Sequence, residues 1–186
     1  MKRALFATLV MILSFQQMAF PQSLEWCEES EERIEKMQNL DLPEDCGVDI
    51  IDNAAKTCKE IADVTIRISP IIKNFYITYF DLEDNAENKS ASPSIDELYG
   101  LGKEVTQLAG KLAELTTSLT NITDIVKSMT AREALSSSSN VKYITQSLPS
   151  IGKELYLDFQ LLGEMIKDKT GNSELLGQLD QIFSWL

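Results

Sequence analysis

Histidine is absent from this sequence, and cysteine, proline, glycine and aromatic residues are all scarce among its 186 residues. Without an imidazole the chain has no Ser-His-Asp or Cys-His triad, no histidine general base and no histidine metal ligand. It also has no Gly-x-Ser-x-Gly elbow, no glycine-rich phosphate loop and no CxxC pair. We therefore predict a protein that is not an enzyme and that holds no cofactor.

The stretch that comes nearest to a metal-binding loop is residues 81–86, where acidic side chains recur. An EF-hand loop needs glycine at its sixth position and a bidentate glutamate at its twelfth. The chain has Ala86 and Ser92 at those two places. We therefore interpret the stretch as a solvated linker and predict no metal site.

Basic residues are few: there are 17 against 29 acidic ones, which gives a formal net charge of −12. Loss of Lys2 and Arg3 with a cleaved signal peptide would lower the charge to about −14. Such a chain is repelled by nucleic-acid phosphates and by anionic membrane surfaces. We expect no nucleic-acid partner, and we expect instead an extracellular protein or an apolar ligand.

Residues 1–23 have the three parts of a secretory signal peptide. Lys2 and Arg3 are followed by the apolar run 4–13 and then by a more polar stretch. The run is shorter than the ~20 residues that span a bilayer, and no later stretch is apolar enough to do so. We predict a secreted, extracellular protein whose residues 24–186 form one domain without a membrane span. The alternative is an uncleaved N-terminal anchor or a buried helix.

Apolar residues recur at steps of three and four along most of the chain, which is the period of an amphipathic α-helix. The clearest seam starts at Leu98, behind a capping-box sequence that begins at Ser94. Pro70 and Pro149 fall inside predicted helices and are expected to kink them. The seams predict an all-α protein with three long helices, at 51–82, 94–135 and 141–166, and two short ones, at 24–40 and 173–186.

The residues beside the longest seam distinguish a bundle from a coiled-coil oligomer. Charge pairs that select a partner flank the seam of a dimeric coiled coil. Here one flank is Gly102, Ala109, Thr116 and Thr123, and the other is Glu97, Glu104, Lys111, Ser118 and Ile125. The small and hydroxyl side chains among them suggest that neighbouring helices approach closely on both sides. Short connections also favour intramolecular packing. We predict an elongated up-down helical bundle, with an extended coiled coil as the alternative.

Three cysteines follow the signal peptide, so an oxidising compartment would leave one of them over. If the first two helices form an antiparallel hairpin, paired residues lie symmetrically about the turn at 41–45. The midpoint of Cys27 and Cys58 falls in that turn, whereas the midpoint of Cys27 and Cys46 falls inside the first helix. We predict a Cys27–Cys58 disulfide and a disulfide-linked dimer through Cys46. A capped or buried Cys46 thiol is the alternative.

Two Asn-x-Ser/Thr sequons, at Asn88 and Asn121, follow the predicted signal peptide. In a secreted chain such triplets are acceptor sites for N-linked glycans. Asn88 lies in the most polar stretch of the chain and is the stronger candidate. We therefore predict a glycoprotein.

Aromatic residues gather at two places that are candidate binding surfaces. On the second helix, Phe75 and Tyr79 continue the core seam, whereas Tyr76 and Phe80 fall on the next face. Core filling is the simpler interpretation, and an apolar cavity or an exposed patch is the functional one. The candidates are Phe75, Tyr76, Tyr79 and Phe80 at the end of the second helix, and Phe183 and Trp185 near the C-terminus.

Two functions agree with these features. The first is an extracellular signalling or interaction factor that presents a helical face to another protein. The second is an extracellular carrier of a lipid or another apolar small molecule in the core of the bundle. The narrow apolar seams favour the first, because helices that cover lipid have a broader apolar face rimmed with lysine.

Overall fold

The computed structural model describes residues 25–82 and 92–171, apart from the side chains of residue 25 and of residues 120–128. Every regular element within these ranges is a helix, so the predicted all-α class is confirmed. The helices are α2 (Glu25–Gln38), α3 (Asp49–Phe80), α4 (Ile95–Ser128), α5 (Ala131–Ser136) and α6 (Ser138–Thr170).

Several of the sequence predictions lie outside the described residues. They are the signal peptide at 1–23, the sequon at Asn88, and the C-terminal helix at 173–186 with Phe183 and Trp185. Asn121 lies within α4, but its side chain is one of those not described.

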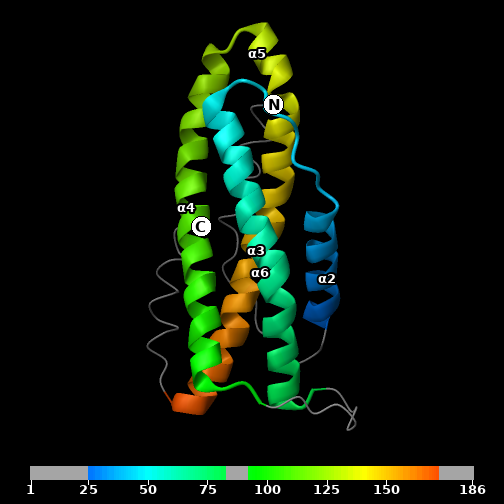
Figure 1. Ribbon diagram of the computed structural model, residues 1–186, viewed down its shortest axis with the longest axis vertical. Coiled ribbons are helices and arrows are strands. Elements are labelled where there is room, and N and C mark those ends of the chain that lie inside the picture. Colours follow the sequence, from blue (N-terminus) through cyan, green and yellow to red (C-terminus); the bar gives the residue numbers. More distant parts are fainter. Residues whose placement is uncertain (1–24, 83–91, 172–186) are drawn as a thin grey trace.

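Four of the helices lie side by side, and successive ones run in alternating directions along the long axis (Figure 1). The short helix α5 lies at the end where α4 passes into α6. Because α6 contacts all four of the other described helices, it forms the centre of the packing. α2 lies on the outside, against α3 and α6 (Figure 1).

The core follows the predicted seams. The seam of α3 from Ile51 to Ile72 is buried throughout, and so is the seam of α6 from Val141 to Ile166. Full burial of one such aliphatic side chain stabilises the fold by about 1.5–3 kcal/mol.

Only one flank of the α4 seam is closely packed. Gly102 and Ala109 on that flank are buried, whereas Lys111 and Ser118 on the other flank are exposed. The expectation of close approach on both sides is therefore wrong. The exposed flank carries surface ion pairs to α3, such as Arg67–Glu104 at 3.0 Å.

α4 begins at the predicted capping box. The Ser94 hydroxyl accepts a hydrogen bond from the backbone N–H of Glu97 at 3.2 Å, and the Glu97 carboxylate accepts one from the backbone N–H of Ser94 at 2.7 Å. These bonds satisfy two backbone donors that the first turn of a helix leaves without partners. The start of the longest helix is therefore fixed by local sequence.

The predicted helix at 94–135 is two helices in the structure. α4 ends at Ser128, and Met129 has an extended backbone (φ −64°, ψ 144°). Thr130 and Glu133 then form a second capping box that starts α5. A Thr-x-x-Glu sequence is a signal for a helix start. The apolar seam continues across this position at helical spacing, and for that reason one helix was predicted over 94–135.

Both internal prolines lie within continuous helices: α3 extends past Pro70 and α6 extends past Pro149. The prediction that neither proline ends its helix is therefore confirmed. None of the helices in the described ranges carries an apolar stretch of the length needed to cross a bilayer.

Candidate binding site between α2 and α3

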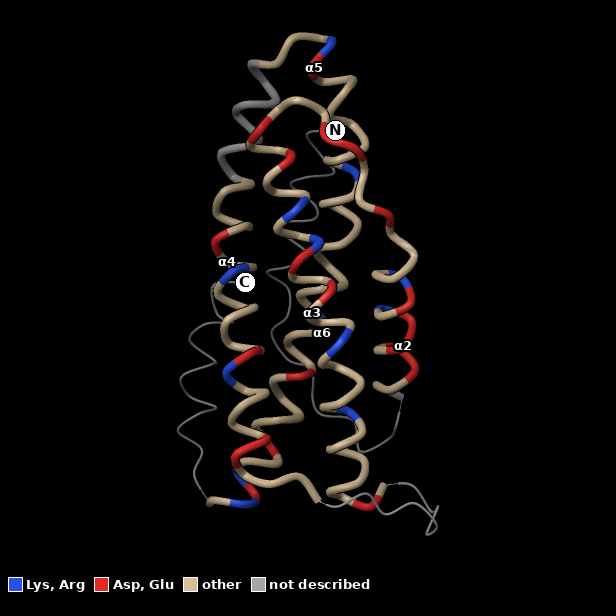
Figure 2. The backbone as a smooth tube through the Cα atoms, viewed as in Figure 1, with Lys and Arg blue, Asp and Glu red and all other residues tan. Residues whose placement is uncertain are grey.

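α2 is attached to the other helices by one apolar face. Trp26, Ile34 and Met37 are buried in the core, and the Trp26 ring meets Tyr76 of α3 edge-on with 5.7 Å between ring centroids. The opposite face is exposed and acidic (Figure 2). It carries Glu28, Glu29, Glu31, Glu32 and Glu35. α2 thus presents a dense negative surface on the outside of the molecule.

Beneath α2 lies a group of buried polar side chains. Glu154 of α6 is fully buried and accepts hydrogen bonds from two residues of α2, the Ser30 hydroxyl and Arg33 Nε, the latter at 2.8 Å. Arg33 also reaches the exposed carboxylate of Glu29 at 3.4 Å. A buried carboxylate is tolerated only when it is paired and hydrogen-bonded. Arg33 therefore compensates Glu154 and ties α2 to α6.

Asp158 lies one turn further along α6 and is also fully buried. Ser69 of α3 donates a hydrogen bond to its Oδ2 at 2.5 Å, whereas its Oδ1 has no hydrogen-bond partner in the described chain. Burial raises the pKa of Asp158 well above its usual range, and the charge of Glu154 raises it further. The Ser69 hydrogen bond and the charges of Lys73 and Arg33 oppose this shift. Asp158 therefore keeps its proton to a higher pH than an exposed aspartate.

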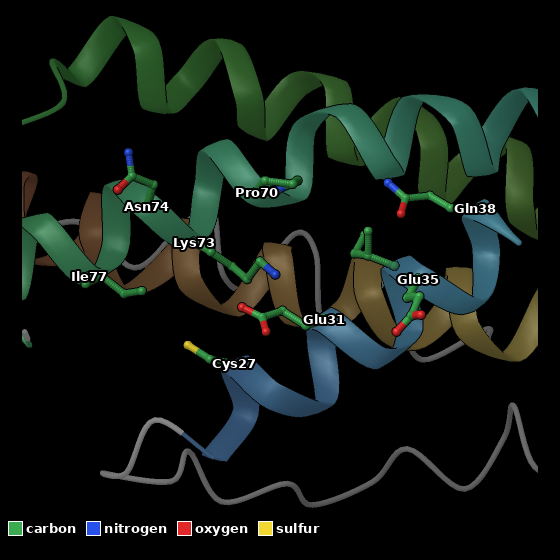
Figure 3. A pocket seen from close by; sticks show the side chains of 9 residues that line it. Cys27, Glu31, Glu35, Gln38, Pro70, Lys73, Asn74 and Ile77 are labelled. Carbon is green, nitrogen blue, oxygen red and sulfur yellow. The ribbon is translucent and has the colours of Figure 1, made fainter.

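Lys73 of α3 connects this buried group to the surface. The residue is only 9% exposed, and it forms no hydrogen bond or ion pair with any residue of the described chain. It lies near enough to Asp158 to affect the pKa of that group. The amine points into a cleft between α2 and α3 (Figure 3). Because buried polar groups normally have partners, Lys73 retains the capacity to bind an anion.

The cleft has a volume of about 460 Å³, within the range of small-ligand sites. Two carboxylates of α2, Glu31 and Glu35, lie on its open side one helical turn apart, and Glu31 points toward Lys73 across the cleft (Figure 3). The apolar lining comes from both helices and includes Ile34, Pro70 and Ile77. The site therefore places one cation, two anions and an apolar wall within reach of a single ligand.

One of the predicted aromatic candidates belongs to the core. Tyr76 is 7% exposed, and its hydroxyl donates a hydrogen bond to Glu164 of α6 at 2.6 Å. The expectation that Tyr76 lies outside the core seam is therefore wrong. The buried face of α3 proceeds from Ile68 to Ile72 to Tyr76 in steps of four, because a straight helix drifts by about 20° per heptad from a 3.5-residue seam.

The other aromatic candidates of α3 lie nearer the surface. Phe75 and Tyr79 are partly buried, and Phe80 is 36% exposed. The Tyr79 hydroxyl donates a hydrogen bond to Asp168 of α6 at 2.7 Å, and the amine of Lys169 lies 4.9 Å from the centre of the Tyr79 ring. These contacts hold the end of α3 against α6, which favours the structural interpretation of the aromatic end.

The structure contains no disulfide: all three cysteines are among the described residues and none is bonded to another. The predicted Cys27–Cys58 bond is wrong because α2 and α3 do not form a tight hairpin. Cys27 lines the cleft beside Lys73 and Ile77, about 22 Å along α3 from Cys58 at 1.5 Å per residue. The extended segment 39–48 displaces α2 along α3 (Figure 1).

Cys46 and Cys58 have different surroundings. The Cys58 thiol is buried against α6, and burial raises its pKa to about 12. Cys46 is half-buried in the 39–48 segment, where burial and a hydrogen bond with Asp52 raise its pKa. Asp52 also accepts hydrogen bonds from the backbone N–H of Cys46 at 2.9 Å and from Asn140 of α6 at 3.1 Å. A dimer through Cys46 stays a prediction.

The polar residues of the site were not among the sequence candidates. Glu154 and Asp158 are spaced four apart, which is also the pattern of a solvated helix face. The available signal was that α6 has apolar residues outside its seam, such as Leu157 and Leu161, both buried. A helix that is apolar on several faces is enclosed, so charged residues within it must be paired or neutral.

Comparisons of the chain with protein-family models, with curated proteins and with solved structures found no match.

Proposed function

We propose that this protein is a secreted, N-glycosylated and non-enzymatic interaction factor, an elongated up-down helical bundle that binds another extracellular protein through the outer surface of α2. The observation that carries the proposal is the acidic face of α2, which lies beside the cleft. Secretion is supported by the signal-peptide pattern at 1–23, and glycosylation by the sequons at Asn88 and Asn121.

The charge of α2 favours a basic partner. Its exposed glutamates are balanced within the helix only by Arg33 and Lys36, and Arg33 is already bound to buried Glu154. Surfaces of one sign attract partners of the opposite sign and raise the rate of association. The association should therefore weaken as salt concentration rises.

An apolar-ligand carrier is the alternative function. The cleft is open on one side, and Glu31, Glu35 and Lys73 contribute charged groups to its lining. Burying these groups against a lipid tail would remove them from water without giving them partners. The lining therefore favours a polar, protein-borne ligand over a lipid.

The proposal is tested with the full chain expressed in a eukaryotic secretory host. The protein should appear in the medium, and removal of N-glycans should lower its mass. Its binding to purified secreted proteins from the tissue that expresses it should decrease with salt. The double variant E28K/E32K should abolish binding, whereas E114K, which reverses an exposed charge on α4, should preserve it.

Three results would contradict the proposal. They are retention of the chain inside the cell, binding that is equal in E28K/E32K and E114K, and co-purification of a stoichiometric lipid in native mass spectrometry. The third result would support the carrier.

A further inference from the structure

The cleft between α2 and α3 contains charges that its own residues do not pair. Lys73 and Glu31 point toward one another from opposite walls (Figure 3), yet they form no ion pair. The salt bridges of α2 within the described chain use Arg33, Glu29 and Glu154 instead. Within the described ranges 25–82 and 92–171, neither the cation at the inner end of the cleft nor the carboxylates at its open side has an ion-pair partner.

The position of Lys73 determines which ligand group reaches furthest into the cleft. Lys73 as a whole is 9% exposed, and its amine points into the cleft (Figure 3). A charge-assisted hydrogen bond from an ammonium in such partly desolvated surroundings is about twice as strong as a neutral one. The deepest group of the ligand should thus be an anion with hydrogen-bond acceptors, such as a carboxylate.

The carboxylates at the open side restrict the rest of the ligand. Glu31 and Glu35 lie on the same face of α2, since residues four apart are neighbours on a helix surface. They repel a ligand with several negative charges and attract a cation placed next to the deep carboxylate. A ligand that carries both charges close together satisfies Lys73 and the two glutamates at once.

The remaining lining suits a short piece of polypeptide. Ile34, Pro70 and Ile77 provide apolar contact, and the amide groups of Gln38 and Asn74 can donate and accept hydrogen bonds. A volume of about 460 Å³ is in the range that encloses a small ligand, and an extended chain advances about 3.3–3.6 Å per residue. The cleft therefore accommodates the end of a chain rather than a whole helix.

We infer that the cleft binds the free C-terminus of a partner protein whose last residue is arginine or lysine. The terminal carboxylate accepts hydrogen bonds from the Lys73 amine, and the basic side chain of the same residue pairs with Glu31 and Glu35. The preceding residue packs on Ile34 and Pro70. This inference rests on the proposed function and specifies the part of the partner that is recognised.

Fluorescence anisotropy with short labelled Gly/Ser peptides tests the inference on the intact protein. A peptide that ends in Leu-Arg with a free carboxylate should bind. The same peptide with an amidated C-terminus, and one that ends in Leu-Glu, should each bind at least about tenfold more weakly. Equal affinity for the free and the amidated peptide would overturn the inference, and so would the absence of measurable binding.

Variants locate the binding to the cleft. K73M should weaken binding of the free peptide by about tenfold or more and leave the weak binding of the amidated peptide unchanged. E31Q/E35Q should reduce the preference for arginine over norleucine at the last position. E114Q, which removes an exposed glutamate of α4 that belongs neither to the cleft nor to the α2 surface, is the matched control and should bind as the native protein does.

The peptide experiment separates this inference from the proposed function. If E28K/E32K abolishes binding of a whole partner while all peptides fail to bind, α2 is the interface and the C-terminal recognition is wrong. If the peptides bind as expected but no extracellular partner is found and the protein is retained in the cell, the cleft is confirmed and the proposed extracellular function is wrong.

Discussion

Ser69 of α3 donates a 2.5 Å hydrogen bond to Asp158 of α6, between two side chains that are fully buried. The other carboxyl oxygen of Asp158 has no partner in the described chain. An ionised carboxylate in this position would be costly because one hydroxyl cannot replace its hydration. Burial of Asp158 therefore favours its neutral acid form, although the Ser69 hydrogen bond opposes that shift.

The first prediction concerns the pH dependence of stability. Because the folded-state pKa of Asp158 is raised, its contribution to stability is complete below the unfolded-state pKa of about 3.9 and is lost as pH rises through the folded-state pKa. Asp158→Asn removes this titration and keeps an acceptor for Ser69. Urea denaturation from pH 4 to pH 9 should show the variant gaining stability relative to the native protein, by about 1–3 kcal/mol at the alkaline end.

The control for this experiment is Asp63→Asn, because Asp63 is exposed and its ion-pair partner among the described residues is Lys59 on the surface of α3. This variant should show no gain in stability at the alkaline end, because it leaves the buried Asp158 carboxyl in place. If Asp158→Asn also shows no gain, Asp158 is ionised in the folded protein and the assignment is wrong.

A second prediction concerns the pair between Arg33 and Glu154. Glu154 is fully buried and Arg33 is 15% exposed, so little solvent screens the pair. Arg33→Met leaves the carboxylate of Glu154 without its cation, which should lower the free energy of unfolding by about 3–5 kcal/mol. The double variant R33M/E154Q should recover most of this loss, because the uncompensated charge is gone.

A double-mutant cycle by urea denaturation measures this coupling. Glu29→Gln is the control: that carboxylate is 63% exposed at 3.4 Å from Arg33, so its loss should change stability by at most about 0.5 kcal/mol. Additive single-variant effects would contradict the buried pairing of Arg33 with Glu154.

A third prediction concerns thiol chemistry. The raised pKa of Cys58, about 12, together with its burial, leaves almost no reactive thiolate at pH 8. Alkylation of the native protein should modify Cys27 and Cys46 first and Cys58 only after unfolding, as mapped by peptide mass spectrometry. A Cys27–Cys58 disulfide in the secreted protein would instead protect both residues until reduction. A reductant-sensitive dimer that is lost in Cys46→Ser would confirm the predicted role of Cys46.

A fourth prediction compares two glycines. A Cβ atom added at Gly110, inside α4, meets nothing within 4 Å. Gly110→Ala should therefore stabilise the protein by up to about 1 kcal/mol through helix propensity alone. Gly47 has φ +81°, so Gly47→Ala should destabilise it by about 1–2 kcal/mol. Thermal denaturation distinguishes the two, and equal shifts of the same sign would contradict the backbone assignment.

The helices were predictable because their signals are local. The seams of α3 and α6 and the capping box at Ser94 depend only on residues within a few turns of one another. The apolar spacing did not predict the end of α4. The capping box at Thr130 starts a new helix there, although apolar residues continue at helical spacing beyond it. Here two local signals compete, and the hydrogen bonds of the cap decide the outcome.

The candidate site was not predictable from the sequence, because it depends on how far α2 is shifted along the axis of α3. The symmetry argument for Cys27 and Cys58 assumed a tight turn, whereas the 39–48 segment is extended and shifts α2 by several turns. The same shift places Arg33 over Glu154 and forms the cleft beside Lys73. No period within a single helix contains this information.

The anchoring of the 39–48 segment through Asp52 has a consequence for local unfolding. At the start of α3, Asp52 accepts hydrogen bonds from Cys46, Gly47 and Asn140. These bonds fix the end of the 39–48 segment, so α2 can separate from α3 and α6 while its connection to α3 stays in place. We expect α2 to open as a cooperative unit of its own, with an opening free energy below that of the three long helices. Its amide hydrogens should exchange as one early group, and the partner that binds α2 should slow that group selectively.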